Sequence, residues 1–543
     1  MNILFTVTYY LFIIHLVRVI IQWLHLWQIK EYRLDRMMVH FRETRQGKNI
    51  VFGFEPLVKL AIIVVYFYSI FNASVYIVVP FAVCAIYGYE VIKLGLDLIQ
   101  KKVKYPVFTP KLILIAIVTV LLVFALLLIP LLDKFFWLVF VDKFVIFIIA
   151  IFMGFFSFPS VFYKDTQINK AISKLRKHKK VKIIGITGSY GKGSTKEYMY
   201  SLVSDYLPTI KTPSTHNTPI GIARTILSKL NNKTKVFIVE MGAYKIGEIA
   251  EMCSFVQPSI GVLTAVNDQH VSLFGSIENT KKAKYEIIES LPATGIALFN
   301  GNNEIVRELY ATTKKKNKYM YMVGDKNIYD AHIFAHTVKV LPTYVTFNLS
   351  VGKSNLNNLR VDVIGAHHLQ NILPGIFVAQ LLKVKDDDIK NALAKIKPLY
   401  KTMQPYTSVE KKILLIDDSY NANPASVMSA IEYLSYQKGK KVLILQPMIE
   451  LGKNAKHDHY LIGLEAGKVC DAVILTNNNF YAEIMKGISE SQTSCSLLVL
   501  SPKKIIDKIL TEYGANDTVV FEGKESQASF DLIPHESVYA ESA

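Results

Sequence analysis

Long apolar runs fill much of the first 160 positions of this chain, and they constrain its fold more than any other feature of the sequence. A helix needs about 20 apolar residues to cross the hydrocarbon core of a bilayer. Five runs approach or reach that length, at 2–26, 56–72, 75–95, 111–132 and 137–158. The sequence therefore predicts an α-helical transmembrane region of about five helices over residues 1–165, followed by a part of ordinary globular composition.

Basic residues are unevenly distributed among the connections between these runs. They crowd the segments 29–49, 100–111 and 164–180, whereas the connections near Asn72 and Asp133 are short and nearly uncharged. Positively charged loops stay on the cytoplasmic side. The alternation predicts a multi-pass protein of the cell (inner) membrane, with its N-terminus outside and its catalytic domains in the cytoplasm. Membrane orientation also explains much of the net charge of +18, so no nucleic-acid partner is expected.

Two charged residues stand out inside the apolar runs, Arg18 and Lys59, and both are expected near the ends of their runs. A pore or carrier is expected to hold charges deep within its spans. The pattern therefore favours an anchor in contact with membrane lipid. The first run lacks a basic start and a small-residue cleavage site, which argues against a cleaved signal peptide.

The stretch GITGSYGKGSTKEY, from Gly185 to Tyr198, predicts a phosphate-binding loop. A buried strand leads into a glycine-rich turn, and an amphipathic helix begins near Lys192. Backbone N–H groups at such a helix start close around phosphate oxygens, and the lysine adds positive charge. The stretch departs from the common pattern twice, because Ile186 replaces the first glycine and Gly193 follows the lysine. Taken alone, it is also compatible with a simple tight turn.

Polar side chains follow two further apolar strands. Glu240 ends the strand in KVFIVEMGA, and His270 follows SIGVLTAVN. The carboxyl ends of parallel strands form the mouth of a nucleotide cleft. A surface salt bridge for Glu240 and a hydrogen-bonded structural role for His270 are the simpler alternatives. The lysines of KKAKYEI, including Lys284, would by themselves predict a solvated helix face.

Seven stretches in order make the chain resemble the Mur ligase superfamily, whose members use ATP to form amide bonds in peptidoglycan stem peptides. They are TGSYGKGSTKE (187–197), TPSTHNTPIGIARTIL (212–227), VEMGAYKIGEIAEM (239–252), NDQHVSLFGSIENTKKAKYEI (267–287), GAHHLQNILPGI (365–376), IDDSYNANPASVMSAI (416–431) and ELGKNAKHDHYLIG (450–463). The SYNANP stretch is typical of the MurF branch, which adds D-alanyl-D-alanine to a UDP-muramoyl tripeptide. The resemblance covers about residues 181–500.

The resemblance implies a multi-domain fold. A basic linker helix is expected at 166–180, an α/β P-loop central domain that binds ATP at 181–397, and a smaller Rossmann-like α/β domain at 398–543. We expect a more β-rich inserted piece near 318–363, and a last strand at 518–523 followed by a loose tail. The membrane region stands where other Mur ligases carry a UDP-sugar-binding domain.

The resemblance also implies site residues. ATP is expected at Thr187, Gly188, Ser189, Gly191, Lys192, Gly193, Ser194, Thr195, Asn371, Asp418, Tyr420 and Asn421. The acceptor is expected at Thr215, His216 and Asn217. Two Mg²⁺ ions are expected at Ser194, Glu240, His270 and Lys284, the last carrying a CO₂-derived carbamate. The expected catalytic residues are Lys192, Lys284 and His270.

Two segments depart from the family pattern. His368 occupies the position of the first asparagine in the family G-x-H-N-x-x-N segment, which is GAHHLQN here. Lys401 and Thr402 stand where the family usually has an arginine that contacts ATP phosphates. Lys401 keeps a positive charge but lacks the bidentate fork of arginine, so altered activity is one expectation.

The sequence as a whole predicts a membrane-anchored, ATP-dependent acid–amino-acid ligase (EC 6.3.2 type) that acts through an acyl phosphate. It is expected to add D-Ala-D-Ala or a similar amine to a nucleotide-linked or lipid-linked muramoyl-peptide carboxylate in cell-wall synthesis. Two alternatives stay open: an anchored amide ligase for another polymer, such as poly-γ-glutamate, and a noncatalytic ATP-binding scaffold of the cell envelope. A transport ATPase is disfavoured because no LSGGQ-like signature is found.

Overall fold

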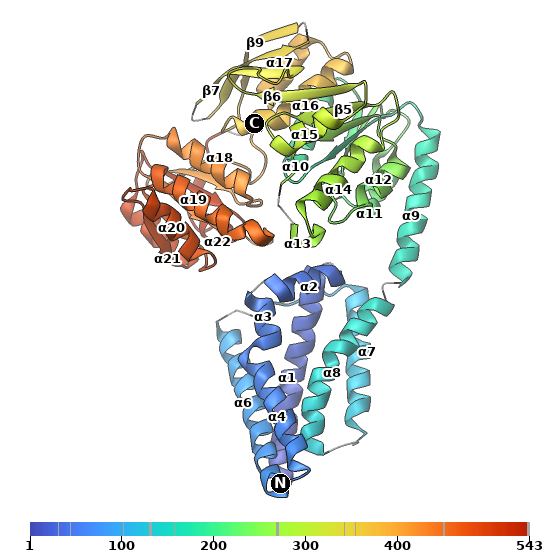
Figure 1. Ribbon diagram of the computed structural model, residues 1–543, viewed down its shortest axis with the longest axis vertical. Coiled ribbons are helices and arrows are strands. Elements are labelled where there is room, and N and C mark those ends of the chain that lie inside the picture. Colours follow the sequence, from blue (N-terminus) through green and yellow to red (C-terminus); the bar gives the residue numbers. More distant parts are fainter. Residues whose placement is uncertain are drawn as a thin grey trace. The chain divides into compact units, whose positions relative to one another are not determined.

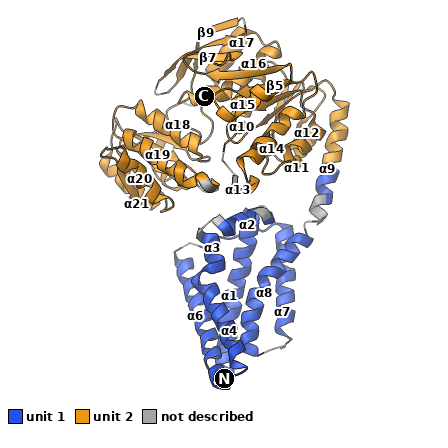
Figure 2. Cartoon of the chain, viewed as in Figure 1, with its two compact units in different colours: residues 1–166 blue, residues 167–543 orange. Residues whose placement is uncertain are grey.

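The computed structural model describes residues 1–30, 32–43, 45–100, 103–129, 133–156, 158–214, 216–267, 271–341, 343–352, 354–448 and 451–539. The chain divides into two compact units, residues 1–166 and 167–543 (Figure 2). The first unit is helical, whereas the second contains two β-sheets covered by helices (Figure 1).

The first unit is built from long apolar helices. Its elements are α1 (Asn2–Ile29), α2 (Leu34–Glu43), α3 (Arg45–Phe52), α4 (Phe54–Ser69), α5 (Ala73–Tyr76), α6 (Val78–Ile99), α7 (Pro110–Leu127) and α8 (Lys134–Phe155). Among the described residues, five stretches are long and apolar enough to cross a membrane: Asn2–Ile29, Gln46–Ser69, Ser74–Ile99, Pro110–Leu127 and Lys134–Phe155. The second stretch begins earlier than the sequence predicts.

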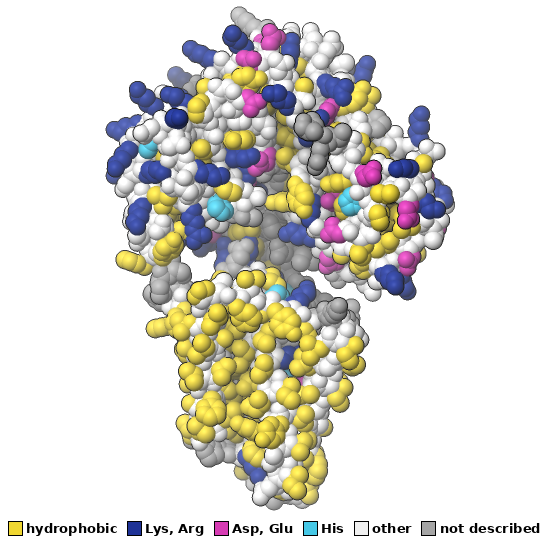
Figure 3. Space-filling model, turned by 180° about the vertical axis from the view of Figure 1, so that it is seen from behind, with side chains coloured by type: hydrophobic (Ala, Val, Ile, Leu, Met, Phe, Trp, Pro, Cys, Tyr) yellow, Lys and Arg dark blue, Asp and Glu magenta, His cyan; other side chains and the backbone are white. Residues whose placement is uncertain are grey.

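Hydrophobic side chains cover the outside of this unit as well as its core (Figure 3). Exposed examples come from each of the five long helices: Ile3, Phe67, Phe81, Leu121 and Phe147. A helix that is apolar on all sides suits a lipid environment better than water, and contiguous apolar surface of this extent is rare on soluble monomers.

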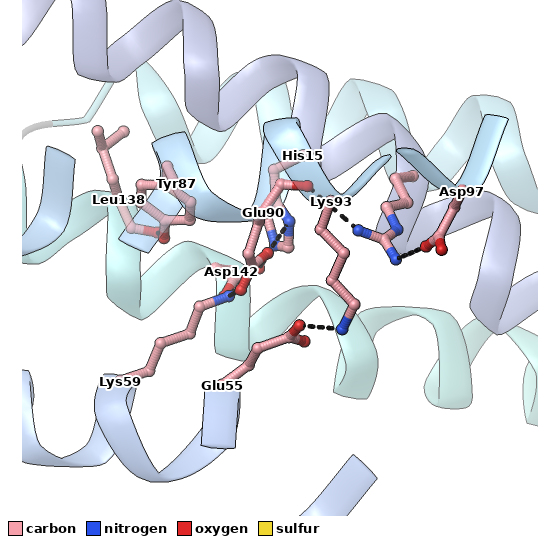
Figure 4. Close-up of polar contacts among 10 residues, drawn as sticks. His15, Glu55, Lys59, Tyr87, Glu90, Lys93, Asp97, Leu138 and Asp142 are labelled. Carbon is pink, nitrogen blue, oxygen red and sulfur yellow. Dashed lines mark hydrogen bonds and ion pairs between the residues drawn. The ribbon is translucent and has the colours of Figure 1, made fainter. Parts of the chain in front are cut away.

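Charged side chains inside this unit correct the sequence analysis. Lys59 lies near the middle of the stretch Gln46–Ser69, because that stretch starts ten residues before the predicted position, 56. It is buried and pairs with Glu90 and Asp142, and both carboxylates also pair with His15 (Figure 4). The expectation that charges lie only near the ends of the spans is therefore wrong.

The second unit begins with a nine-stranded sheet of order β2-β3-β1-β4-β5-β6-β7-β8-β9. Its strands are β1 (Lys182–Thr187), β2 (Thr209–Lys211), β3 (Val236–Glu240), β4 (Ile260–Leu263), β5 (Ile296–Asn300), β6 (Lys318–Val323), β7 (Ile333–Val340), β8 (Val345–Val351) and β9 (Ser354–Val361). Strands β1 to β7 pair in parallel, whereas β8 and β9 are antiparallel. The β-rich stretch near 318–363 thus extends the central sheet, because β6 pairs with β5.

Helices cover both faces of this sheet. They are α9 (Phe158–Lys177), α10 (Lys192–Val203), α11 (Pro219–Lys229), α12 (Glu248–Val256), α13 (Val271–Phe274), α14 (Ile277–Glu289), α15 (Glu304–Thr312), α16 (His367–Leu381) and α17 (Asp386–Lys395). In β1, Ile184 and Ile186 pack with α10, α16 and α17, whereas Ile183 packs with α11, α12 and α14. This alternation is the two-residue period of a strand buried on both faces.

The C-terminal part forms a seven-stranded sheet of order β14-β13-β12-β15-β11-β10-β16. Its elements are β10 (Gln404–Ser408), β11 (Leu414–Asp418), α18 (Pro424–Ser435), β12 (Lys441–Leu445), α19 (Ala455–Val469), β13 (Ala472–Leu475), α20 (Tyr481–Glu490), β14 (Ser496–Val499), α21 (Pro502–Glu512), β15 (Thr518–Glu522), α22 (Gln527–Phe530) and β16 (His535–Ser537). Strand β15 is not the last, since β16 adds to the edge of the sheet antiparallel to β10.

Glu286 ties α14 to the start of α12. Its two carboxylate oxygens accept hydrogen bonds from the backbone N–H groups of Gly247, at 2.6 Å, and Ala250, at 2.9 Å. Free N–H groups at a helix start need such acceptors, and a negative charge there is favoured by the helix dipole. The glutamate of the KAKYEI stretch therefore holds in place the helix that carries Lys284.

We expect Glu286→Ala to destabilise the second unit by about 1–3 kcal/mol, because two N–H groups at the start of α12 lose a buried, charged acceptor. Urea unfolding of the full chain, followed by near-ultraviolet circular dichroism, measures this loss. Glu289→Ala is the control, since Glu289 is exposed on the same helix. Equal stability of the two variants would contradict the assigned role.

Candidate active site

Two glycines shape the turn between β1 and α10. Gly188 has φ +155, and a Cβ there would lie 2.1 Å from Thr264 Oγ1 and 2.8 Å from the backbone nitrogen of Ala265. Gly191 has φ +78, and its Cβ would lie 2.5 Å from Asn371 Oδ1. No side chain fits at either position without displacing backbone or a buried amide. The turn therefore delivers open backbone N–H groups to the N-terminus of α10, as a phosphate-binding loop requires.

Lys192 is the first residue of α10, and its side chain folds over the turn. Its Nζ donates hydrogen bonds to the carbonyl oxygens of Gly188, at 2.7 Å, and Ser189, at 3.0 Å. Burial lowers the pKa of this ammonium, while the nearby charge of Glu240 acts in the opposite direction. The lysine thus lies over the loop, bonded to two of its carbonyl oxygens.

Glu240 stands at the carboxyl end of β3, beside β1. Its carboxylate accepts hydrogen bonds from Lys196 Nζ, at 2.9 Å, and from Asn217 Nδ2, at 3.2 Å. Burial alone would raise its pKa, but the positive charges of Lys196 and Lys192 outweigh that effect and lower it. The carboxylate is therefore ionised, and an added Cβ at Gly193 would lie 3.7 Å from its Oε2.

Lys284 is buried, with only 3 % of its surface exposed, whereas its neighbour Lys281 lies at the surface between Glu278 and Glu308. The Nζ atom of Lys284 donates to the carbonyl oxygen of Ala243 at 3.0 Å and lies 5.3 Å from the centre of the Phe274 ring. Burial, and then the charge of Lys192, lower its pKa well below the ordinary value. Desolvation therefore favours a neutral amine at this position.

A small pocket, partly open to solvent, lies among these groups. Its lining residues are Ser189, Lys192, Asn217, Gly242, Ala243, Tyr244, Phe274 and Lys284. Two expected catalytic residues, Lys192 and Lys284, thus share one pocket, and Glu240 reaches it through its hydrogen bond to Asn217. Three residues of the site, Tyr244, Phe274 and Lys196, are not predicted from the sequence, although all three fall within the stretches that carry the family resemblance.

The remaining loop residues divide into buried and accessible ones. Thr187 Oγ1 donates to the carbonyl oxygen of Met241, and Thr195 Oγ1 donates to Asn371 Oδ1 at 3.3 Å. Both threonines are fully buried, whereas Ser194 is half-buried. Asn371 therefore supports the loop from behind, and Ser194 is the more accessible hydroxyl after the lysine.

Two expected residues lie outside the described part of the chain, His270 and Thr215. The neighbouring His216 is half-buried, and its Nδ1 lies 3.4 Å from Thr225 Oγ1, away from the lining of the pocket. Among the described residues, no three His, Cys, Asp or Glu side chains gather as they would around a metal ion.

His368 packs inside the domain, between α16 and α10. Its Nδ1 lies 3.0 Å from the hydroxyl of Tyr198, and burial lowers its pKa well below the ordinary value. Burial likewise lowers the pKa of the adjacent His367 to about 4. Both rings are therefore neutral, and the residue that replaces the usual asparagine has a packing role in this structure.

In the C-terminal part, the SYNANP stretch contacts the segment around Lys401. The backbone N–H of Tyr420 donates to the carbonyl oxygen of Lys401 at 3.0 Å, and the N–H of Met403 donates to Asp418 Oδ1 at 3.2 Å. The side chains of Tyr420 and Asn421 are exposed. The two segments that the sequence analysis connected with ATP thus lie side by side.

Asp418 has a buried carboxyl neighbour, Glu522, at the matching position of the parallel strand β15. Glu522 is fully buried, and its Oε1 accepts a hydrogen bond from Ser426 Oγ at 2.6 Å. Burial raises the pKa of Asp418 to about 6 and that of Glu522 well above its ordinary value. Two adjacent carboxyls in an apolar site cannot both ionise cheaply, so the pair keeps a proton near neutral pH.

The fold and the pocket together define a P-loop α/β protein with a second, Rossmann-like domain. The Mur ligase middle domain matches residues 186–379, and the Mur ligase, glutamate ligase domain, matches residues 403–525. The chain belongs to the Mur ligase family. Members of this family are ATP-dependent ligases of the EC 6.3.2 type, as the sequence predicts.

Relatives and solved structures agree with this assignment. The chain is 28% identical over 353 residues to the UDP-N-acetylmuramoyl-tripeptide–D-alanyl-D-alanine ligase of Escherichia coli K12. This match covers 64% of this chain and 76% of the relative. It is 30% identical over 332 residues to the enzyme of the same name from Buchnera aphidicola, with coverage of 60% and 71%.

Two solved structures share the fold. MurF from Acinetobacter baumannii matches with a TM-score of 0.60 and 23% identity, over 68% of this chain and 80% of that chain. MurF from Thermotoga maritima, in complex with ADP, matches with a TM-score of 0.59 and 24% identity, over 68% and 83%. The two-domain α/β architecture of residues 167–543 is thus that of MurF.

The carboxyl pair predicts how stability depends on pH. Because both folded-state pKa values lie above the unfolded values, the folded state binds more protons, and stability falls as the pH rises through about 6 and beyond. Glu522→Gln removes one ionisable group and keeps its shape, so we expect it to stabilise the chain at pH 8 by at least about 1 kcal/mol, and by less toward pH 5.

Thermal unfolding at a series of pH values measures this effect. Glu465→Gln, at a half-exposed position on α19, is the control and should follow the wild type. The quantity to compare is the difference in stability between Glu522→Gln and the wild type at each pH. If this difference is less favourable to the variant at pH 8 than at pH 5, the shared proton is refuted.

Proposed function

We propose that this chain is a membrane-embedded, ATP-dependent amide ligase of cell-wall synthesis. It phosphorylates a muramoyl-peptide carboxylate and joins the resulting acyl group to D-Ala-D-Ala or a similar amine. The observation that carries the proposal is the pocket shared by Lys192 and the buried Lys284, whose pKa is lowered well below its usual value, with Glu240 hydrogen-bonded to the lining residue Asn217. The helical unit (1–165) and linker helix (166–180) precede a central ATP-binding domain (181–397) and a C-terminal domain (398–543).

The turn after β1 fits the phosphates of ATP. Because Gly188 and Gly191 have no Cβ, the space beside their backbone stays open. Phosphate oxygens can lie in that space against backbone N–H groups. The ammonium of Lys192 and the hydroxyl of Ser194 lie at the start of the same helix. From the C-terminal domain, the exposed Tyr420 and Asn421 are the candidates to reach the nucleotide.

Mg²⁺ is expected beside the pocket, where the Glu240 carboxylate and the Ser194 hydroxyl offer hard oxygen donors. Glu240 would hold it together with Ser194 and, by resemblance, His270 and a carbamylated Lys284. When bound, the ion would stabilise the negative charge that develops during phosphoryl transfer. Carbamylation requires a neutral amine, whose lone pair attacks CO₂ with release of one proton, and burial keeps Lys284 in that form.

The protein's own groups account for the rest of the chemistry. Lys192 and the loop N–H groups orient the γ-phosphoryl group toward the acceptor carboxylate, whose oxygen attacks it with ADP as the leaving group. The amine then attacks the acyl phosphate and loses a proton as inorganic phosphate departs. Asn217 lines the pocket and is hydrogen-bonded to Glu240, which makes it, with its neighbours Thr215 and His216, the candidate contact for the acceptor.

The helical unit supports a location of this reaction at a membrane. Its five apolar stretches and its apolar outer surface support insertion, and the basic connections support a cytoplasmic catalytic part. A lipid-linked acceptor would then diffuse in two dimensions beside a tethered enzyme, which raises its effective concentration.

The ligase reaction is tested with the full chain in detergent micelles. We expect ATP-dependent release of phosphate that requires both a muramoyl-peptide acceptor and D-Ala-D-Ala. Dependence on glutamate alone would favour the poly-γ-glutamate alternative, and ATP binding without turnover with any pair would favour the scaffold.

Within the same assay, Lys284→Ala should lower phosphate release at least 100-fold, and short carboxylic acids should restore part of it by replacing the carbamate. Lys281→Ala, on the same helix but at the surface, should keep the wild-type rate. Full activity of Lys284→Ala without added acid would rule out the carbamate.

Membrane placement is tested separately from the reaction. The chain should resist extraction by high salt and alkaline carbonate and be released by detergent. Added protease should digest the ligase part in inverted vesicles and spare it in intact spheroplasts. Extraction by carbonate, or digestion in spheroplasts, would overturn the insertion or the orientation, respectively.

A further inference from the structure

We propose that the helical unit contains a proton-binding site at the imidazole of His15. Its partners are Lys59, Glu90 and Asp142, from α4, α6 and α8, and the four residues together are called the His15 ring. The inference goes beyond the ligase reaction and rests only on the membrane placement proposed above.

The His15 ring is closed and alternates in charge (Figure 4). Lys59 Nζ lies 2.8 Å from Glu90 Oε1 and 2.7 Å from Asp142 Oδ2. On the opposite side, His15 Nε2 lies 2.8 Å from Asp142 Oδ1, and its Nδ1 contacts Glu90 Oε2. All four side chains are at most 6 % exposed, so the partners are fixed by packing as well as by charge.

The two imidazole nitrogens reveal the protonation state that this geometry favours. Each faces a carboxylate oxygen, and both can donate only when the imidazole carries two protons. The ring then contains two cations and two carboxylates and is neutral as a whole. Neutrality matters here, because each residue lies near the middle of one of four candidate membrane spans, where an uncompensated charge is costly.

The same geometry also provides a second arrangement. Lys59 Nζ lies 3.3 Å from His15 Nε2. When the N–H bond at Nε2 breaks and the proton leaves to water, this nitrogen becomes an acceptor and Lys59 can donate to it, while Nδ1 stays with Glu90. The ring changes from neutral to a net charge of minus one. Lys59 then replaces Asp142 as the hydrogen-bond partner of Nε2, so this imidazole nitrogen has a partner in both states.

Every helix packed around His15 contributes to its electrostatic environment. The charged or titratable groups near the imidazole are Arg18 on α1, Lys59 on α4, Tyr87 and Glu90 on α6, and Asp142 and Lys143 on α8. The Tyr87 ring lies 5.4 Å from the imidazole and 5.2 Å from Lys59 Nζ, and its hydroxyl donates to Leu138 O at 3.3 Å. Helix α7 carries Lys111 as its sole charged residue, near its first turn.

Paired charges continue from the ring toward one end of the bundle. Arg18, one turn after His15, donates to the Glu90 carbonyl oxygen at 3.2 Å and to the Asp97 carboxylate at 2.9 Å. Lys93 and Glu55 form a further ion pair (Figure 4). Asp97 lies seven residues after Glu90, which is about 10 Å along a helix. Side-chain exposure rises along this path, from 10 % at Arg18 to 41 % at Lys93.

The opposite direction is closed by apolar side chains. Phe12, Tyr87 and Phe135 are fully buried, and the rings of Phe12 and Tyr87 pack 5.4 Å apart, edge to face. A proton therefore reaches His15 from the end of the helical unit that carries the basic connections. The last of these connections leads along the chain into the ligase part. Among the described residues, the paired charges end at the ring, and the site is therefore expected to bind a proton from one side without conducting it across the bundle.

The proton site is tested on the full chain in lipid nanodiscs, with histidine rings labelled with ¹⁵N. His15→Asn identifies the signal of His15 among the 13 histidines. We expect a doubly protonated imidazole at neutral pH that releases a single proton, from Nε2, as the pH is raised. A neutral His15 at pH 7, or one that never titrates while the chain stays folded, would refute the site, and the wild-type titration alone decides this.

The role of the ring is tested by Asp142→Asn, which should weaken proton binding at His15 at least tenfold because Nε2–H loses a charged acceptor. Asp133→Asn, which alters the cap of the same helix α8 outside the ring, is the matched control and should leave the His15 titration unchanged. An unchanged titration of His15 in Asp142→Asn would show that the four residues hold the helices together but do not determine proton binding at His15.

The route is tested by the double variant Arg18→Leu, Asp97→Leu. The exchange of the imidazole proton of His15 with water, measured by NMR in the same nanodiscs, should slow at least tenfold. Exchange at the wild-type rate would refute access from this end. Failure of the chain to insert would appear independently, in the carbonate extraction.

Discussion

The close approach of Gly188 to the start of the loop after β4 fixes the geometry on which the ligase centre depends. A Cβ at Gly188 would overlap Thr264 and Ala265, so the backbone can pass there only as glycine. That passage lets β1 turn directly into α10 and puts Lys192 at the helix start. Because β3 and β4 flank β1 in parallel, Glu240 and the residues after β4 reach the same edge of the sheet.

Desolvation then gives neighbouring lysines different chemistry. Lys281 stays charged between two surface glutamates, whereas Lys284, three residues later, is buried against Ala243 and Phe274. Lys196 and Glu240 illustrate the opposite case, in which two buried charges stabilise each other. The surroundings of each lysine, rather than its residue type, decide whether it acts as a cation, a counter-ion or a latent nucleophile.

Local patterns were sufficient to predict much of the architecture. The phosphate loop and the helix start at Lys192 follow from glycine placement and periodicity, and the family resemblance singled out Lys284 among the lysines of its stretch. Strand β16 was missed, because three residues in a polar tail carry no periodic signal, and they become a strand only by pairing with β10. The shared proton of Asp418 and Glu522 also depends on a register between distant strands.

The His15 ring was missed for the same reason. Its members lie on four helices, and His15 and Asp142 are 127 residues apart, so no local window contains two partners. In the sequence, Arg18 and Lys59 lie near the ends of their predicted runs, which is the pattern of a simple anchor. The partners of a charged residue within an apolar run are determined by how the helices pack together, and they cannot be read from the run itself.

The closed ring has an evolutionary consequence. Losing one member strands its neighbours in a medium that does not solvate them, at a cost of about 3–5 kcal/mol, whereas exchanging all four for apolar side chains need cost little. Descendants of this chain should therefore inherit the four positions as a set or abandon them together, and lineages with one, two or three of them should be rare.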